Sequence, residues 1–344
     1  MNMTRRILAF ALLACLLTGC AAPAVEEKAT VYEASFLTLF DTVTVIKGTA
    51  ESQEAFGEIA RQIHDELLYY HQLFDIYHDY EGVNNLKTVN DQAGIGPVEV
   101  DEVIIRLLTD CKNYYQLTGG KVNVAMGSVL HLWHEARNEG LDDIANAKLP
   151  DMQKLEEASR HTSMDCVVID AEKGTVFITD PEARLDVGAV AKGWAAQRAA
   201  EHAPAGLLMS VGGNVCATGP KYKGTPWVIG VRDPAGSASD YLHTLYVSGG
   251  SVVTSGDYQR TYMVDGKLYH HIIDPETRMP SEYWRSVSVI CADSGLADAL
   301  STALFLMSQE DGQQLLDQCG AEAMWVDGNG NCFYSPGFRN NIRT

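Results

Sequence analysis

The stretch YQRTYMVDGKLYHHII, residues 258–273, contains the strongest strand-pairing signal in the chain. Two β-prone runs, 258–263 and 268–273, flank the tetrapeptide Val264-Asp265-Gly266-Lys267. Asp-Gly between such runs predicts a two-residue hairpin turn, because both turn positions need a positive φ angle. Strands joined this closely must pair antiparallel, since a parallel pair needs a crossover of a dozen or more residues.

Similar pairs of short strands joined by turns are expected over the second half of the chain, whereas the first half is expected to be mainly helical. Strands arrive as hairpins and helices arrive as pairs, which predicts an α+β protein with antiparallel sheets and flanking helices rather than a doubly wound sheet. Helical spacing, the Asp101 cap and a glycine stop after residue 117 mark the helices. Strands are expected at 36–47, 166–170, 176–179, 206–211, 227–231, 242–247, 251–254, 287–291, 323–326 and 332–334, and helices at 52–74, 101–118, 130–139, 151–158, 189–202 and 296–307.

The composition is that of a globular protein with a strongly acidic balance. The chain has 344 residues, of which 46% are hydrophobic and 21% charged, and its formal net charge is −19. Such a field repels the phosphate backbone, so a nucleic-acid partner is not expected. A small phosphorylated ligand remains compatible with the charge, provided that a local cation neutralises it.

The N-terminal segment has the features of a lipoprotein signal. Arg5 and Arg6 precede an apolar run at 7–17, which is too short to span a bilayer. Leu17-Thr18-Gly19-Cys20 then resembles the bacterial lipobox, in which the cysteine thiol is diacylated before cleavage. The alternative is an ordinary signal peptide with a coincidental cysteine. Cleavage before Cys20 removes two arginines and no acid, which leaves a charge of about −21.

These features predict three parts of the chain and one location. Residues 1–19 form the signal peptide, 20–34 a tether that starts at the lipidated Cys20, and 35–335 the functional domain. Two or three acyl chains hold a protein firmly on a bilayer, whereas one chain is marginal. The expected location is therefore the outer face of a bacterial cell membrane, reached through a lipid anchor.

Several common site signatures are missing from the sequence. There is no P-loop motif and no G-x-G-x-x-G after a strand, so neither a P-loop nor a Rossmann nucleotide site is expected. The order His131-x-x-His134-Glu135 differs from the H-E-x-x-H of zinc proteases. What remains is a set of four turns and helix faces, none of which identifies a site by itself.

Two of them are glycine turns. Asp186-Val187-Gly188-Ala189-Val190-Ala191-Lys192-Gly193 leads into a helix, whose N-terminus can face an anion beside the Lys192 ammonium. Ser210-Val211-Gly212-Gly213-Asn214 follows an apolar strand, and its paired glycines let main-chain N–H groups reach a ligand. The alternatives are a simple strand-to-helix connection for the first and a tight hairpin for the second.

The other two bring together groups that core packing does not require. Thr254-Ser255-Gly256-Asp257-Tyr258 precedes His270-His271-Ile272-Ile273-Asp274-Pro275, and a histidine there is a candidate general base. In 296–303, Asp298 lies three residues before Ser301 and four before Thr302, so their oxygens share one face of an apolar helix. A buried carboxylate beside hydroxyls suits a hard divalent cation, although helix capping by Asp298 is the alternative.

These motifs, taken in order, resemble the ApbE family of flavin transferases, which are commonly bacterial lipoproteins. The likeness covers about residues 35–334. The family stretches D-V-G-x-x-A-K-G, S-x-G-G-N, W-x-I-G-x-x-D-P, T-S-G-D-Y, H-I-I-D-P and A-D-A-x-x-T stand here at 186–193, 210–214, 227–234, 254–258, 271–275 and 297–302. The resemblance implies the T-fold-like architecture of this family.

The resemblance also implies an activity. The enzyme would bind FAD with Mg²⁺ and transfer FMN to a Thr or Ser hydroxyl of a client flavoprotein, releasing AMP. Two alternatives are an FAD pyrophosphatase that gives free FMN and AMP, and a non-catalytic FAD-binding lipoprotein. An Mg²⁺ ion would let a diphosphate approach so acidic a protein and would polarise the phosphorus under attack.

The family's functional positions can be carried over residue by residue. His271 falls on the inferred base, and the metal ligands fall on the Ala189 carbonyl, Asp298 and Thr302, with Ser301 able to add an oxygen. The residues assigned to FAD are Tyr77, Asn123, Val124, Ala125, Asp186, Lys192, Gly212, Gly213, Ser255, Asp257 and Ile272. Tyr80 lies close enough to Tyr77 to compete for its place.

Three positions depart from the family pattern. Phe40-Asp41-Thr42 stands where Met-Gly-Thr is common, which bears on flavin contacts. Asn123 replaces the usual acid, which bears on adenosine binding. Arg278 replaces the usual glycine after H-I-I-D-P-x-T, so a change is expected in the loop beside His271.

Overall fold

The computed structural model describes residues 30–237 and 240–343, and the folded unit begins at Val31. Residues 1–19 and the lipidation site Cys20 lie outside the described residues. Strand β1 (Val31–Phe36) covers the last four residues of the predicted tether. Its burial alternates, and Tyr32, Ala34 and Phe36 pack on the core, so the boundary between tether and domain lies at Val31.

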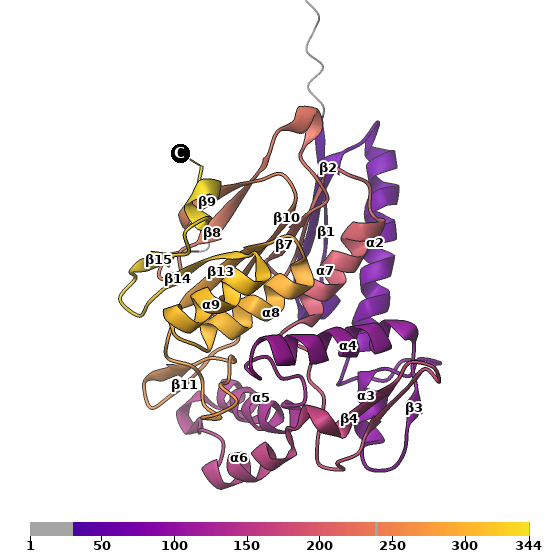
Figure 1. Ribbon diagram of the computed structural model, residues 1–344, viewed down its shortest axis with the longest axis vertical. Helices are drawn as coiled ribbons and strands as arrows, with labels where there is room; N and C mark the ends of the chain where they lie inside the picture. The colour runs from indigo at the N-terminus through magenta and orange to yellow at the C-terminus, as the bar shows by residue number, and fades with distance from the viewer. Residues whose placement is uncertain (1–29, 238–239, 344) are drawn as a thin grey trace, which may run out of the picture. The chain divides into compact units, whose positions relative to one another are not determined.

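The centre of the fold is an antiparallel sheet of eight strands in the order β1-β2-β6-β7-β10-β13-β14-β15 (Figure 1). Every pair in it is antiparallel, as the hairpin pattern predicts. The remaining strands of the sheet are β2 (Thr44–Thr49), β6 (Leu207–Val211), β7 (Asn214–Ala217), β10 (Gly250–Gly256), β13 (Ser286–Cys291), β14 (Glu322–Val326) and β15 (Cys332–Tyr334).

Different elements pack on the two faces of this sheet. Along β14, Ala323 and Trp325 face one core, whereas Met324 and Val326 face another, as the two-residue period of a strand requires. Helices α2 (Gln53–Phe74), α7 (Ala191–His202), α8 (Ser294–Phe305) and α9 (Gln309–Cys319) lie on the first face, as Figure 1 shows. A ribbon of β8 (Trp227–Arg232) and β9 (Tyr241–Val247) packs on the second face.

Local signals explain where the main helices begin. Ser52 caps α2 by accepting a hydrogen bond from the Ala55 N–H, and Asp101 caps α4 (Glu102–Leu117) in the same way through Val103. Helix α8 is buried on almost every side, so its single acid, Asp298, lies inside the protein. That burial makes the chemistry of α8 dependent on what faces Asp298.

Smaller elements surround the lower end of the sheet in Figure 1. They include helices α3 (Leu86–Asp91), α5 (Gly127–Asp142) and α6 (Met152–Ala158), and the three strands β3 (Val98–Glu99), β4 (Val167–Asp170) and β5 (Thr175–Ile178). The Asp-Gly hairpin forms between β11 (Tyr262–Val264) and β12 (Lys267–Tyr269), with positive φ at Asp265 and Gly266. Its strands are shorter than the sequence predicts, because the chain leaves the ladder to form the site described below.

Other differences from the sequence expectations have local causes. Residues 36–47 do not form one strand, since Thr38, Phe40 and Asp41 adopt positive φ and separate β1 from β2. Strands β3 and β7 and helices α3 and α9 were not predicted. Both β7 and α3 are very short, and α9 buries only Gly312, Leu315 and Leu316 among many polar residues. Within the described residues no helix is both long and apolar enough to cross a bilayer.

Candidate active site

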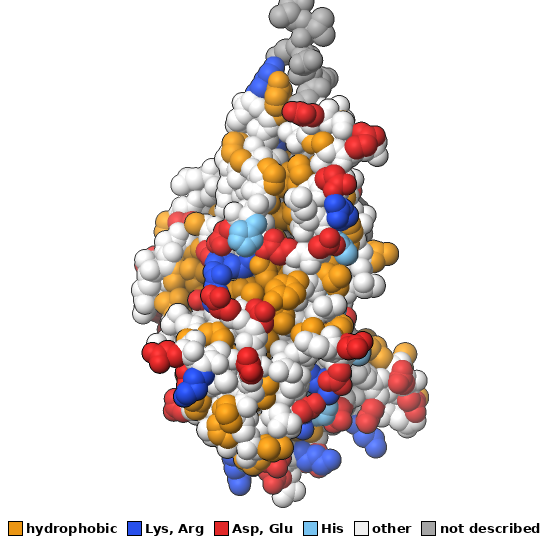
Figure 2. Space-filling view, turned by 90° about the vertical axis from the view of Figure 1, so that its right-hand side faces the viewer, with side chains coloured by type: hydrophobic (Ala, Val, Ile, Leu, Met, Phe, Trp, Pro, Cys, Tyr) orange, Lys and Arg blue, Asp and Glu red, His pale blue; other side chains and the backbone are white. Residues whose placement is uncertain are grey.

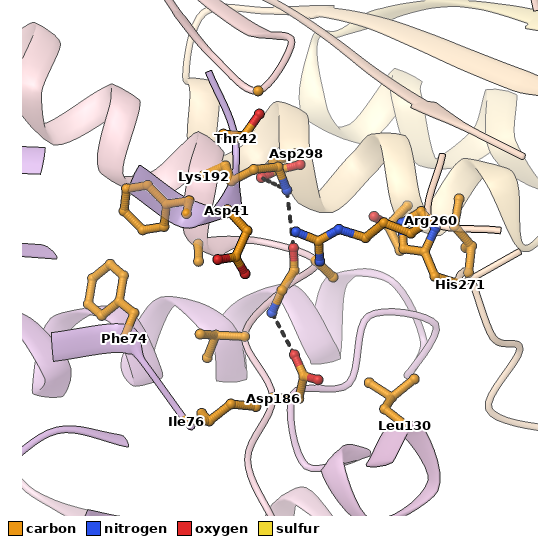
Figure 3. Close-up of a pocket in the computed structure, with 18 of the residues that line it drawn as sticks. Asp41, Thr42, Phe74, Ile76, Leu130, Asp186, Lys192, Arg260, His271 and Asp298 are labelled. Atoms are coloured by element: carbon orange, nitrogen blue, oxygen red, sulfur yellow. Dashed lines mark hydrogen bonds and ion pairs between the residues drawn. The ribbon is translucent and has the colours of Figure 1, made fainter. Parts of the chain in front are cut away.

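One cavity of about 800 Å³ collects most of the residues selected from the sequence (Figure 3). Its walls come from α8, the turn before α7, the β6–β7 turn, the end of β10, the segment after β12 and the segment after α2. This volume lies in the range of sites for small molecules and cofactors. Acidic side chains are spread over the face in Figure 2, so an anionic ligand depends on cations supplied within the cavity.

Asp298 lies at the inner end of this cavity and is only 4% exposed. Its Oδ2 accepts hydrogen bonds from the Gly193 N–H and from the Asn214 side-chain amide, both at 2.8 Å. The Lys192 ammonium is 3.9 Å from the same oxygen. Burial raises the pKa of Asp298, and Lys192 and the two hydrogen bonds act in the opposite direction. The Asp298 Oδ1 has no protein partner within the described chain and is free to meet a ligand.

Gly193 allows helices α7 and α8 to cross closely at this point. A Cβ on Gly193 would collide with the Ser294 carbonyl oxygen and with the Asp298 Cβ. Because the Gly193 N–H is given to Asp298, it does not bond back to Ala189, whose carbonyl lacks a donor among the described residues. The crossing therefore places a free carbonyl and a buried carboxylate at one cavity.

The turn before α7 continues this line of polar groups. The Lys192 ammonium donates to the Gly188 carbonyl at 3.2 Å, and the Gly188 N–H donates to Asp186 Oδ1 at 2.8 Å, as the dashed lines in Figure 3 trace. The Asp186 N–H in turn bonds to the Val124 carbonyl. Asp186 and Lys192, which the resemblance assigned to FAD, line the cavity together with Gly188.

The two hydroxyls that follow Asp298 on α8 have different surroundings. Thr302 lines the cavity, and no hydrogen bond engages its hydroxyl in the described part of the chain. Ser301 is fully buried and does not line it. Its hydroxyl bonds to the Asp298 carbonyl at 2.9 Å and to the Ser255 hydroxyl at 2.8 Å. The structure therefore separates Ser301 from the predicted metal-ligand set, because Ser255 occupies the direction in which its oxygen points.

His271 faces the same cavity, and its imidazole has one fixed hydrogen bond. Nδ1 lies 3.1 Å from the Gln259 carbonyl oxygen, which can only accept, so Nδ1 carries the proton and Nε2 is left with a lone pair. Burial lowers the pKa of His271 to about 3, helped by the nearby Arg260 and Lys192. The ring is therefore neutral at physiological pH and can accept a proton at Nε2.

Aromatic residues after α2 form the opposite wall. Tyr77 and Tyr80 both line the cavity, so the structure does not choose between them as the flavin-facing ring. The buried Asp75 carboxylate holds this segment by accepting hydrogen bonds from the Tyr77 N–H at 2.7 Å and from the Tyr80 hydroxyl at 2.8 Å. The Tyr77 hydroxyl is 2.6 Å from His134 Nδ1 on α5.

Several residues assigned to FAD from the resemblance have structural duties instead. Val124 and Ala125 are buried in the main core, and Asn123 lines the cavity while its amide is bound to the Ala125 N–H and the Thr162 carbonyl. Asp257 pairs with Arg285 at 3.1 Å and does not line the cavity. These side chains are engaged by the protein itself.

Gly212 and Gly213 form the tight hairpin turn between β6 and β7, which was the alternative interpretation of this motif. Gly212 lines the cavity, and a Cβ there would contact the Thr42 side chain at 2.8 Å. Gly213 has a φ of 92° and does not line it. Ile272 and Ser255 do line the cavity, as predicted.

Sequence reasoning missed the residues that reach the cavity from loops. Arg260 enters from the side of His271 and Asp41 from the segment before β2, as Figure 3 shows. Four of the seven non-glycine residues with positive φ in the described chain line this cavity: Thr38, Phe40, Asp41 and Arg260. Such strain gathers at functional sites. For Arg260 the available signal was the cluster of polar residues around a predicted hairpin, which pointed to His271, and for Asp41 it was the departure from Met-Gly-Thr at residues 40–42.

The Arg278 departure also has a structural result. Arg278 keeps a φ of 61°, the left-handed conformation that a glycine adopts freely. Its carbonyl accepts a hydrogen bond from the Trp133 indole at 2.9 Å, which ties the loop to α5. The loop therefore has a glycine-type backbone although its residue is not glycine.

Solved structures place this fold in a known class. The ApbE protein from Thermotoga maritima superposes with a TM-score of 0.81 at 31% identity, and covers 92% of this chain and 100% of its own. The flavin transferase ApbE from Vibrio cholerae gives 0.75 at 22% identity over 91% of this chain and all of its own. The chain thus has the fold of flavin transferases of this type.

Sequence comparison identifies the family. A model of the ApbE family matches residues 37–325. An FAD:protein FMN transferase of Treponema pallidum is 35% identical over 260 residues, or 70% of each chain. One from Klebsiella pneumoniae is 32% identical over 266 residues, or 74% of this chain and 80% of that one. The chain belongs to the ApbE family, which confirms the resemblance and the α+β fold class.

Proposed function

We propose that this protein is an FAD:protein FMN transferase, which moves FMN from FAD to a Thr or Ser hydroxyl of a client flavoprotein and releases AMP. The observation that carries the proposal is the meeting of Asp298, Thr302 and the Ala189 carbonyl with His271 around one cavity. Mere storage of FAD would need neither a proton acceptor nor a buried carboxylate. The family membership and the names of the relatives support the same activity.

The oxygens at the inner end fit a hard divalent cation such as Mg²⁺. They are the free Oδ1 of Asp298, the Ala189 carbonyl released by the Gly193–Asp298 bond, and the unengaged Thr302 hydroxyl. Among the described residues, no group of three or more His, Cys, Asp or Glu side chains is arranged to hold a metal ion, and the donor set proposed here has one carboxylate and two neutral oxygens. Bound there, Mg²⁺ would neutralise the diphosphate and polarise the phosphorus that is attacked.

His271 would act on the acceptor. Its Nε2 takes the proton of the client hydroxyl, and the oxygen then forms a bond to the FMN phosphorus of FAD while the bond from that phosphorus to AMP breaks. Lys192, which lies between Asp298 and the Gly188 carbonyl, would add positive charge where the leaving phosphate develops negative charge. The aromatic rings of Tyr77 and Tyr80 would contact the flavin end of FAD.

The cellular setting is part of the proposal. Lipidation of Cys20 would anchor the domain to the outer face of the membrane, with residues 21–30 as the tether before β1. A membrane-anchored enzyme would then meet client flavoproteins of exported redox complexes. Labelling with a radioactive fatty acid, compared between the natural protein and Cys20→Ala, tests the anchor directly.

The test of the activity uses purified protein, FAD, Mg²⁺ and a candidate FMN-binding domain, followed by intact mass measurement of that domain. A gain of one FMN with stoichiometric AMP supports the proposal. AMP and free FMN with an unmodified client would show a pyrophosphatase instead. If FAD binds and no AMP is formed under any of these conditions, the protein is a flavin-binding lipoprotein and the proposal is wrong.

A further inference from the structure

A second, smaller cavity of about 230 Å³ adjoins the first. We call it the annex pocket, and it is lined by Asp41, Tyr77, His134, Arg137, Asn138 and Arg260. Four of these six also line the large cavity, whereas Arg137 and Asn138, on α5, line the annex alone. Tyr77 and His134, which are hydrogen-bonded to each other, line both spaces.

The annex pocket contains two guanidinium groups without an ion-pair partner. Neither Arg137 nor Arg260 has a carboxylate oxygen within 4.0 Å in residues 30–237 and 240–343. Arg137 donates only to the Asn138 side-chain oxygen, at 3.3 Å, and its Nε is buried without any hydrogen-bond partner. A buried donor of a charged group left in this state is unfavourable, and an incoming anion would relieve it.

The local charge balance favours an anion as well. Burial lowers the pKa of Arg137, and the positive charge of Arg260 lowers it further. The Asp41 carboxylate is the acid of the annex lining, and Asp186 acts on Tyr77 and His134 from the large cavity. Two guanidinium groups against one lining carboxylate leave a net positive pocket in a protein whose formal charge is −19.

The position of the annex pocket relates it to the acceptor. Arg260 directly follows Gln259, whose carbonyl fixes the His271 imidazole, and Figure 3 shows Arg260 and His271 on the same side of the cavity. On the proposed function, the acceptor hydroxyl must reach Nε2 of that imidazole. The chain on either side of the acceptor residue would then run past the annex pocket.

We propose that the annex pocket binds a carboxylate side chain of the client protein, with Arg137 and Arg260 as its hydrogen-bond donors. An Asp or Glu near the acceptor Thr or Ser would thereby seat the client, and this inference rests on the proposed function. Guanidinium forks match carboxylates in geometry and charge. The large cavity already has the volume for a dinucleotide, so Arg137, which lies only in the annex, is available for the second substrate.

The experiment uses fluorescent peptides that carry one threonine and one aspartate at varied spacing, and the same peptides with asparagine. Their binding to the FAD-loaded protein is measured by fluorescence polarisation for the natural protein, Arg137→Met and Arg137→Lys. FAD affinity is measured separately by flavin fluorescence. The matched control is Arg160→Met, which removes an exposed arginine that is 3.7 Å from Glu156.

We expect one spacing at which aspartate binds roughly tenfold more tightly than asparagine in the natural protein. Arg137→Met should abolish that difference, Arg137→Lys should keep part of it, and Arg160→Met should keep all of it, with FAD affinity unchanged throughout. The proposal is overturned if no aspartate peptide is preferred, or if Arg137→Met weakens FAD and leaves the peptides unaffected. The second result would assign the annex pocket to a phosphate of the dinucleotide. An Arg137-dependent preference in a protein that transfers no FMN would overturn the proposed function alone.

Discussion

The two ends of the large cavity are built in opposite ways. At the inner end, Asp298, Thr302 and the Ala189 carbonyl come from α8 and the start of α7, where buried packing holds the backbone. At the outer end, Phe40, Asp41 and Arg260 come from loops and have positive φ. We infer that the two ends have different roles. The inner end suits binding of a cation, which needs oxygens at fixed positions. The outer end suits recognition of the flavin or of the client protein.

The largest effect should come from Asp298→Ala at the inner end. Removing the carboxylate removes the charged ligand proposed for Mg²⁺, so AMP release and FMN transfer should fall by about 10³-fold or more. Both are measured by chromatography and by the mass of the client. Thermal unfolding serves as the control, because Gly193 and Asn214 lose their acceptor. Turnover within tenfold of the natural protein, at equal folding, would remove the metal-site assignment.

The next effect concerns His271, at the boundary between the two ends. His271→Ala should lower transfer about 10²- to 10³-fold through loss of the proton acceptor, with FAD affinity little changed. Because the pKa of His271 is lowered to about 3, its neutral form persists down to that pH. A profile of kcat/KM against pH should therefore show no loss of activity near pH 6.5 from this imidazole. An acidic limb at pH 6.5 that disappears in His271→Ala would contradict this.

A smaller effect should separate the two neighbouring hydroxyls of α8. Thr302→Val, which removes an oxygen that lines the cavity, should lower the rate about 10- to 30-fold and raise the Mg²⁺ concentration needed for half-maximal rate. Ser301→Ala removes an oxygen that bonds to Ser255, and should change the rate less than threefold. Mg²⁺ titrations of both variants provide the measurement. Equal dependence on the two residues would restore Ser301 to the ligand set.

The smallest effect tests backbone strain in the loop that holds Arg278, which does not line the cavity. Arg278→Gly should stabilise the protein by about 0.5 to 1 kcal/mol, because glycine adopts the observed φ of 61° without steric strain. The Trp133 indole still finds the main-chain carbonyl of residue 278 in this variant. Chemical denaturation of the natural protein, Arg278→Gly and Arg278→Ala measures the change. A glycine variant less stable than the alanine variant would show that the conformation is not strained.

Most of the fold and the α8 side of the inner end were predictable because they depend on short-range patterns, whereas the Ala189 carbonyl was assigned only through the resemblance to the family. Helical periodicity places Asp298 and Thr302 on one face, and Ser52 and Asp101 mark helix starts by their capping chemistry. The same periodicity misplaces Ser301, because the competing contact with Ser255 arises between elements 46 residues apart.

The outer end could not be predicted from such patterns. Asp41, Tyr77 and Arg260 line both the large cavity and the annex pocket, which Arg137 reaches from α5, and no spacing in the sequence links these four residues. The turn at residues 38–41 has positive φ angles but contains no glycine, so the sequence pattern predicts one continuous strand over 36–47. The first four residues of β1 were assigned to the tether, because this strand alternates between half-buried and exposed residues and has no fully buried face.

The crossing of α7 and α8 at Gly193 has a consequence for how the inner site responds to its ligand. The Gly193–Asp298 hydrogen bond holds the carboxylate in place and leaves the Ala189 carbonyl without a donor, so binding of the proposed cation would cost little conformational entropy. The proposed cation site would then be preorganised, because both oxygens depend on the close packing of α7 against α8 at Gly193. A bulkier residue at 193 would therefore weaken cation affinity by spreading both oxygens at once, even in a chain that still folds.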